Sequence, residues 1–198
     1  MINLIVQFYK VNYDNVDASL IRKRQDEITF CFKKNLLYKH LEKIHFLYEN
    51  YSDVEFLKEE GIDIDNNKIK ILKLGKRLTY SDVFEYANKN LDGKNVVYLH
   101  SDMCLDRGFE QLQYGGTDGT DGTDGTDGTD GSFLNKNKIY ALTAHNLLNC
   151  GKTLKCGCVR QFYTPRGLMT PTIDGFAFTT PIKQNVIDTA THIVHHMG

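Results

Sequence analysis

The sequence predicts one α/β domain with a mostly parallel sheet flanked by helices. Short apolar runs that are typical of buried strands alternate with segments whose apolar residues recur at helical spacing. Strands are expected at Ile2 to Phe8, Ile44 to Tyr48, Ile69 to Leu74, Val96 to Leu99 and Ile139 to Thr143, with a further apolar run from Gly175 to Phe178. Strands that alternate with helices form βαβ units, and such units build a largely parallel sheet.

Two of the helices are marked by their apolar faces. The first covers Leu20 to Leu37, and the second begins at Thr79, which forms a capping-box-like pair with Asp82. The core-facing residues are Ile28, Cys31, Phe32 and Leu36 in the first helix and Val83, Ala87 and Leu91 in the second. The pairing with Thr79 also offers a purely structural role for Asp82.

Length and charge limit the classes of protein to consider. A chain of 198 residues, 41% of them hydrophobic, suits a single globular domain spanning residues 1–198. The formal net charge is −1, and it becomes +4 when the five aspartates between Thr117 and Gly131 are left out. A mildly basic body suits an anionic ligand but falls short of the basic stripe of a nucleic-acid-binding protein. We therefore expect no nucleic-acid partner.

Cysteine usage and the N-terminus indicate the compartment. Five cysteines without a signal-peptide pattern are typical of free thiols in a reducing compartment, which predicts a cytoplasmic protein. The N-terminal run INLIVQF is too short to span a membrane and suits a first strand, so no integral membrane segment is expected. No heptad pattern identifies a partner chain, and the oligomeric state is left open.

Residues 115–132 form a low-complexity tract, GGTDGTDGTDGTDGTDGS, that repeats every three residues and contains no apolar side chain. Such a tract cannot offset its ordering entropy by burying surface, which favours a surface loop. Calcium binding through the periodic aspartates is a second interpretation. The nine-residue repeats of calcium β-rolls, however, include an apolar residue that this tract lacks.

The apolar run from Val96 to Leu99 passes directly into His100, Ser101 and Asp102. In open α/β sheets ligands bind beyond the carboxyl ends of the strands, so a carboxylate there can hold a divalent cation that also contacts a diphosphate. The competing interpretation is turn chemistry, in which Asp102 only caps the next turn.

Six blocks of the sequence carry a resemblance to a known family. They are RQDEITFCFKKNL, IHFLYEN, GKRLTYSDVFEYAN, VVYLHSDMCLD, IYALTAHN and TIDGFAF. These blocks resemble segments of compact GT-A-type glycosyltransferases, including small domains of chlorella viruses and other large DNA viruses. In order, they resemble the first helix, the second strand, the segment after the third strand, the shortened DxD element, the following strand and the late Asp-plus-aromatic segment. The resemblance implies a GT-A-like domain, which in a viral protein would act in the host cytoplasm.

The resemblance implies that Asp102 corresponds to the last aspartate of the DxD element, which coordinates Mn²⁺ or Mg²⁺ bridged to the donor diphosphate. His100 stands at the first position of that element, in place of a second carboxylate. A neutral imidazole adds no negative charge, so His100, together with Ser101, is assigned to donor binding, through the ribose or through the metal.

The resemblance also places the nucleotide base at the end of the first strand, at Gln7, Phe8 and Tyr9, although Phe8 equally suits the core. Arg24 and Arg77 are candidates for binding the diphosphate, because a guanidinium matches phosphate oxygens with two parallel hydrogen bonds. A solvated charge at a helix end is the competing interpretation for each arginine.

Asp174 is the candidate catalytic base. In an inverting transfer a carboxylate deprotonates the acceptor hydroxyl as it attacks the anomeric carbon. Lying between Pro171-Thr172 and Gly175, Asp174 equally suits a turn without chemistry. In a retaining transfer it would instead position the acceptor or stabilise positive charge on the sugar.

The function implied by the resemblance is transfer of a sugar from a nucleotide-diphosphate donor, foremost a UDP-sugar, to a hydroxyl of a glycan acceptor. A sugar nucleotidyltransferase fits the same residues, but no glycine-rich phosphate loop follows the first strand. A sugar-nucleotide-binding or glycan-binding protein without turnover is the third interpretation, and the presence of His100 in place of an acid favours it.

Two further clusters suggest metals. The first contains Cys150, Cys156, Cys158 and His145, and the second contains His192, His195 and His196. The cysteine cluster has no CxxC pair, which favours free thiols over a zinc site. The histidine cluster suits a surface helix, although some GT-A enzymes take a late histidine as a metal ligand.

Overall fold

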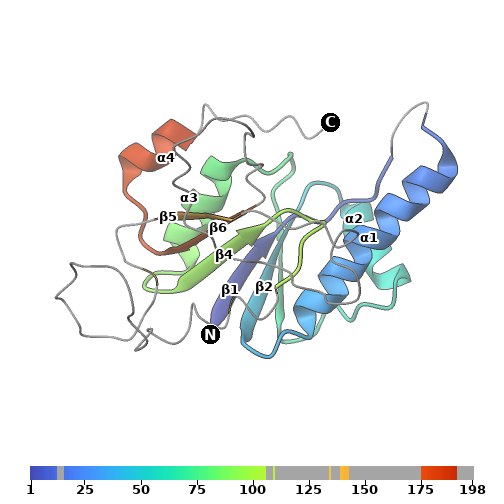
Figure 1. Cartoon of the computed structure of the whole chain (residues 1–198), viewed down its shortest axis with the longest axis horizontal. Coiled ribbons are helices and arrows are strands. Elements are labelled where there is room, and N and C mark those ends of the chain that lie inside the picture. Colours follow the sequence, from blue (N-terminus) through green and yellow to red (C-terminus); the bar gives the residue numbers. More distant parts are fainter. Residues whose placement is uncertain (13–15, 106–108, 110–133, 135–138, 143–174, 191–198) are drawn as a thin grey trace, which may run out of the picture.

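The structure is a computed structural model that describes residues 1–12, 16–105, 109, 134, 139–142 and 175–190. This part of the chain forms one six-stranded sheet with helices on both faces (Figure 1). The arrangement confirms the predicted α/β class. The repeat at residues 115–132 lies outside the described residues, so its interpretation as a loop or as a calcium site stays a prediction, as does the single-domain organisation of residues 1–198.

The strands are β1 (Ile2–Val6), β2 (Leu41–Tyr48), β3 (Ile69–Lys73), β4 (Asn95–Leu99), β5 (Ile139–Leu142) and β6 (Gly175–Thr179). The helices are α1 (Ala18–Leu36), α2 (Tyr51–Glu59), α3 (Tyr80–Asn90) and α4 (Gln184–Ala190). Within the described ranges, no helix combines the length and the apolar character needed to cross a membrane.

Some boundaries differ from the prediction for identifiable reasons. β1 ends at Val6, so Gln7 and Phe8 follow the strand instead of belonging to it. β2 begins at Leu41 rather than Ile44, because Leu41 pairs with Ile2 although the polar Glu42 and Lys43 interrupt the apolar run. The predicted cap at Thr79 is confirmed, since its side chain accepts a hydrogen bond from the amide of Asp82.

The strand order is β3-β2-β1-β4-β6-β5. β3, β2, β1 and β4 are parallel, whereas β6 runs antiparallel to both β4 and β5. The sheet is therefore mixed and mostly parallel, as expected for βαβ units. The chain moves outward from β1 to β3 and then returns to place β4 on the other side of β1, so the strand order reverses between β1 and β4.

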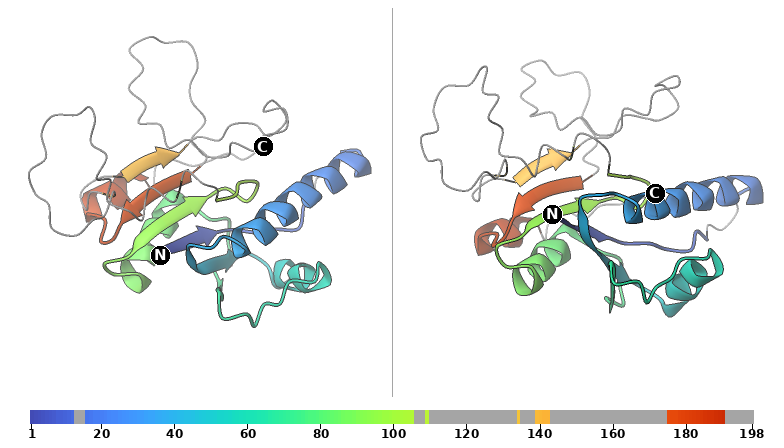
Figure 2. Two further views of the ribbon diagram at one scale, coloured as in Figure 1. Left: turned by 60° about the horizontal axis from the view of Figure 1, so that its bottom comes forward. Right: turned by 90° about the horizontal axis from the view of Figure 1, so that it is seen from below.

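Helices α1 and α2 cover one face of the sheet, and α3 and α4 cover the other (Figures 1 and 2). The alternation of side chains along β4 shows why both faces are apolar: Val97 and Leu99 join the cluster under α1 and α2, whereas Val96 and Tyr98 join the cluster under α3 and α4. The continuous apolar runs of the sequence are explained by burial on both faces.

A buried polar network crosses β1, β2 and α3. The imidazole of His45 is only 3% exposed, with Nδ1 2.8 Å from the hydroxyl of Tyr86 and Nε2 3.0 Å from Oδ1 of Asn3. The amide nitrogen of Asn3 donates to Glu42, which turns Oδ1 toward the ring. Because Oδ1 only accepts, the neutral imidazole carries its proton on Nε2 and accepts from Tyr86 at Nδ1.

We expect acid to destabilise the fold through His45. Burial, with the charges of Lys70 and Lys43, lowers the pKa of His45 from 6.5 to about 4. The unfolded chain therefore binds a proton at His45 as the pH falls below about 6.5, whereas the folded protein does not until the pH nears 4. This difference lowers the free energy of unfolding by about 2 kcal/mol at pH 5. Urea unfolding of the wild type and of His45→Gln at pH 7 and pH 5 measures this difference. Equal losses in the two proteins would contradict it.

Candidate functional site

The predicted donor residues come together where β1 and β4 end. Residues Gln7 to Tyr9 follow β1 and residues His100 to Asp102 follow β4, and these two strands are parallel neighbours, with Leu4 opposite Val97. Both segments thus leave the sheet at its carboxyl edge, at the point where the strand order reverses. In open α/β sheets this is where ligands bind.

Arg24 and Asp102 form an ion pair at this edge. Nη2 of Arg24 lies 2.8 Å from Oδ2 of Asp102, and Nη1 lies 2.7 Å from Oε2 of Glu27. Burial alone would lower the pKa of the guanidinium, but the hydrogen bond to Glu27 and the charge of Asp102 raise it above its usual value. Arg24 is therefore paired with two carboxylates and is not a solvated helix-end charge without a partner. The carboxylate of Asp102 thus pairs with Arg24 of α1, so its role is not limited to capping the turn after β4.

Gln25, the next residue of α1, binds the backbone of the segment that follows β1. Its Oε1 accepts from the amide of Val11 at 2.7 Å and its Nε2 donates to the carbonyl of Tyr9 at 3.4 Å. Consecutive residues of one helix therefore contact the segments that follow both β1 and β4. Sequence reasoning missed Gln25, although a glutamine one turn before the apolar stripe at Ile28 is a detectable signal.

Gln7 and Phe8 have structural contacts. The buried amide of Gln7 donates to the carbonyl of Lys76 at 3.3 Å and accepts from the amide of Leu78 at 3.1 Å, which ties the loop after β3 to the end of β1. Phe8 is fully buried, and its ring packs edge-on against Phe32. These contacts support the core interpretation of Phe8 and leave a role in base binding untested for both residues.

Tyr9 and Arg77 lie together at the end of β1. The guanidinium carbon of Arg77 lies 5.1 Å from the centre of the Tyr9 ring, and Nε lies 3.7 Å from Oε2 of Glu49. Arg77 is exposed and Tyr9 is half-buried, so both present surface to a ligand. A cation over an aromatic ring is the kind of contact that a planar base can join. The sequence predicts that Tyr9 contacts the base and that Arg77 contacts the diphosphate, and the structure brings the two side chains into contact.

His100 is half-buried and Ser101 is buried at the end of β4. The half-buried imidazole of His100 packs edge-on against the ring of Tyr98, with 5.8 Å between the ring centres, and Ser101 is 6% exposed. A turn follows β4, in which the amide of Met103 donates to the carbonyl of His100 at 3.1 Å. This turn leaves the side chain of Asp102 free to reach α1.

Two more buried polar side chains, one from α1 and one from α2, bind the backbone of segments that follow β4 and β1. Asn35 of α1 is 1% exposed; it donates to the carbonyl of Met103 at 3.0 Å and accepts from the amide of Leu105 at 2.7 Å. Asp53 of α2 accepts from the amides of Lys10 and Asn50. The contacts of Asn35 could not be predicted, because their partners lie 68 and 70 residues away along the chain, whereas the spacing of Asn50 and Asp53 could have indicated the capping box that these two residues form. The site is therefore organised by side chains that bind backbone.

We expect Asn35→Ala to destabilise the fold by about 2 kcal/mol, because it leaves the buried amide of Leu105 and the carbonyl of Met103 without their partner. Urea unfolding measures the loss. Asn35→Asp keeps an acceptor for Leu105 but cannot donate to Met103 when ionised, so its stability should recover as the pH falls. A pH-independent loss in Asn35→Asp would show that the two hydrogen bonds are not responsible.

The described residues at the carboxyl edge supply too few carboxylates to hold a metal ion without a further ligand. Asp102 is the single carboxylate of the segment from His100 to Asp102. The described part of the chain contains no group of three or more His, Cys, Asp or Glu side chains placed to hold a metal. Mg²⁺ is commonly bound by one or two carboxylates together with substrate phosphates. The arrangement therefore fits an ion that arrives with a diphosphate, and not one that these residues would hold alone.

Several predicted residues lie outside the described part of the chain. They are Asp174, the cluster of His145, Cys150, Cys156 and Cys158, and the cluster of His192, His195 and His196. The strand that follows Asp174 begins at Gly175, which pairs with Leu99 at the end of β4.

Cys31 and Cys104 are buried free thiols, in line with the expectation for those two residues.

Comparison with protein families and with curated proteins finds no match to this chain.

Proposed function

We propose that this protein is a GT-A-type glycosyltransferase that moves a sugar from a nucleotide-diphosphate donor, foremost a UDP-sugar, to a hydroxyl of a glycan. The observation that carries the proposal is the pairing of Arg24 with Asp102 at the reversal point of the sheet. A cation and a carboxylate side by side suit a diphosphate and the divalent ion that accompanies it. The mixed, mostly parallel sheet is compatible with a GT-A fold.

The donor would bind across the ends of β1 and β4. Arg24 would turn from Asp102 toward the diphosphate oxygens, which leaves the carboxylate of Asp102 for Mn²⁺ or Mg²⁺. Such an ion, when bound, neutralises charge on the departing nucleoside diphosphate. Tyr9 and Arg77 would contact the base, with His100 and Ser101 near the ribose.

Asp174 is proposed as the base of an inverting transfer. Its carboxylate would take the proton of the acceptor hydroxyl while the hydroxyl oxygen bonds to the anomeric carbon. The bond between that carbon and the diphosphate oxygen breaks with its electron pair leaving on the diphosphate. If the transfer retains configuration, Asp174 would position the acceptor instead.

A protein that binds the sugar nucleotide without turnover is the second candidate. The residue that favours it is His100, because an imidazole supplies no second carboxylate for a metal. In that case the nucleotide would bind through Arg24, and EDTA would not weaken its affinity. A sugar nucleotidyltransferase remains a less supported alternative.

Calorimetric titration of UDP tests the proposal. We expect UDP to bind with Mn²⁺ present and to bind at least about tenfold more weakly in EDTA, because the ion removes the repulsion between Asp102 and the diphosphate. Mn²⁺ without UDP should not bind at the described edge. Turnover of UDP-sugars then separates the enzyme from the binding protein. Absence of UDP binding in both conditions would refute the UDP-sugar donor.

A further inference from the structure

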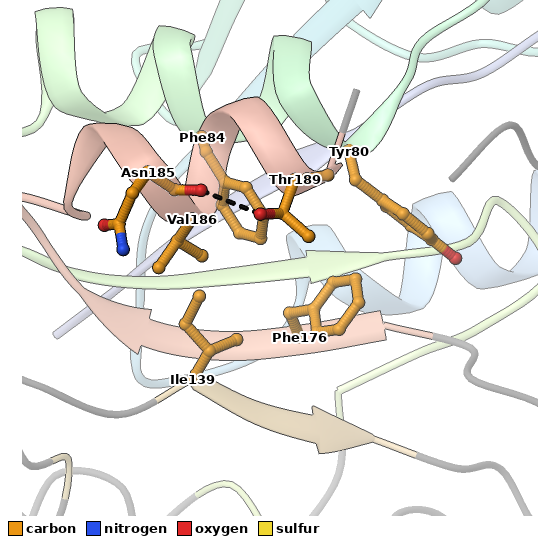
Figure 3. Close-up of a pocket in the computed structure, with 8 residues that line it drawn as sticks. Tyr80, Phe84, Ile139, Phe176, Asn185, Val186 and Thr189 are labelled. Atoms are coloured by element: carbon orange, nitrogen blue, oxygen red, sulfur yellow. Dashed lines mark hydrogen bonds between the residues drawn. The ribbon is translucent and has the colours of Figure 1, made fainter. Parts of the chain in front are cut away.

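A pocket of about 290 Å³ lies on the face of the sheet that is covered by α3 and α4 (Figure 3). The buried side chains of Tyr80 and Phe84, both from α3, line its inner part. Asn185 and Thr189 of α4 line it as well, and both are exposed. The pocket therefore extends from solvent into the apolar cluster under α3 and α4.

Aromatic rings form one wall of the pocket. The ring of Phe176 lies 4.8 Å from that of Tyr80 at an angle of 86°, and 5.8 Å from that of Phe84. The first contact is edge-to-face and the second is tilted, and aromatic pairs at these distances are favourable. Ile139 of β5 and Val186 of α4 face the same space in Figure 3, and both are half-buried.

The polar groups of the pocket are few. The hydroxyl of Thr189 donates to the backbone carbonyl of Asn185 at 2.8 Å, which is the contact drawn in Figure 3. Among the described residues that line the pocket, none is charged. A phosphate would lose its hydration here without a cation to replace it, so the pocket does not suit the donor diphosphate.

The pocket adjoins the end of β4 through a single ring. Tyr98 packs edge-on against Tyr80, with 5.8 Å between the ring centres, and stacks on Phe176 at 6.4 Å. Tyr98 also packs against the imidazole of His100, with 5.8 Å between the ring centres. Tyr98 therefore separates the pocket from the segment proposed to hold the donor.

We propose that this pocket binds an uncharged apolar group of single-ring size, and that this group is the non-sugar part of the glycoside acceptor. The identification of the ligand as a glycoside acceptor rests on the proposed function, whereas the binding of an apolar group does not. The volume lies at the lower limit of small-molecule pockets, so it suits one ring and not a nucleotide. The substrate class is then a hydrophobic glycoside, with its sugar toward the end of β4 and its apolar group under α4.

Phenol is the first probe, because it is a neutral single ring that is soluble enough for titration by saturation-transfer NMR. Val186→Phe should fill the pocket and weaken phenol binding at least about tenfold. Thr189→Phe, at an exposed position, adds a ring at the outer part of the pocket and serves if Val186→Phe does not fold. Asp188→Asn on the exposed side of α4 is the matched control and should bind phenol like the wild type.

Absence of phenol binding, or equal binding by the wild type and by both filling variants, would overturn the pocket assignment. This readout does not depend on any nucleotide, so it separates failure of the pocket from failure of the proposed function.

The acceptor assignment is tested by turnover. With a UDP-sugar that supports transfer, a phenyl glycoside should exceed the methyl glycoside of the same sugar about tenfold or more in kcat/KM, and Val186→Phe should remove that advantage. Equal kcat/KM values for the two glycosides in the wild type would overturn the acceptor assignment even if phenol binds.

Discussion

Asp102→Asn is expected to lose Mn²⁺-dependent binding of UDP and to lower sugar transfer by roughly 100-fold or more. The substitution keeps the size of the side chain but removes the negative charge that a divalent ion requires beside the diphosphate. It also removes the charge that holds Arg24 at 2.8 Å, so Arg24 becomes available to the diphosphate. Residual UDP binding by the variant should therefore no longer respond to EDTA. Calorimetry with Mn²⁺ and with EDTA measures both effects.

Glu27→Gln is the matched control for this experiment. Glu27 is the other carboxylate in contact with Arg24, at 2.7 Å, and it is half exposed, so its removal costs little stability. It also frees Arg24 from one partner but leaves Asp102 unchanged. We expect Mn²⁺-dependent UDP binding to persist in Glu27→Gln. If both variants lose UDP binding equally, Asp102 acts by holding Arg24 and not by holding a metal.

Gly175→Ala is expected to lower the free energy of unfolding by roughly 3 kcal/mol. A Cβ atom at Gly175 would lie 2.3 Å from the carbonyl oxygen of Tyr98 and 2.9 Å from the side chain of Leu99. The first of these is backbone of β4, paired with β6, so relief requires the two strands to separate. Because β4 leads into His100 and Asp102, UDP affinity should fall as well.

Gly61→Ala is the glycine control. Gly61 has a φ of +75° and no heavy atom within 4 Å of the added Cβ, so alanine there meets only backbone strain of about 1 kcal/mol. Urea unfolding of the two variants and the wild type compares the effects. A loss for Gly175→Ala no larger than that for Gly61→Ala would show that β4 and β6 accommodate the methyl group.

The apolar runs predicted the strands well because burial on both faces of a parallel sheet leaves a direct record in the sequence. Leu41 shows the limit of that record. It is 1% exposed and pairs with Ile2, yet Glu42 and Lys43 separate it from the run that begins at Ile44. The antiparallel direction of β6 was also not readable, since a short apolar run is the same in either direction.

In the candidate site, too, the sequence indicated single residues but not the contacts between them. The sequence indicates a role for Asp102 because it lies just beyond a buried strand, and for Arg24 because of its guanidinium, but nothing in the sequence links the two. Gln25 and Asn35 escaped notice for the same reason, since each binds backbone amides and carbonyls that lie far along the chain. Local patterns reveal which face of an element is apolar, not which side chain reaches which loop.

The sequence by itself determined the α/β class, the principal strands, the cap at Thr79 and the presence of a carboxylate at the end of β4, because each depends on neighbouring residues and on burial. The tertiary structure alone decided that Arg24 pairs with Asp102, that Gln7 holds the loop after β3, and that Tyr80 and Phe176 line a pocket beside Tyr98. The physical reason is that such contacts join elements through the order of strands in the sheet. That order results from packing the whole chain and is not recorded in any short segment.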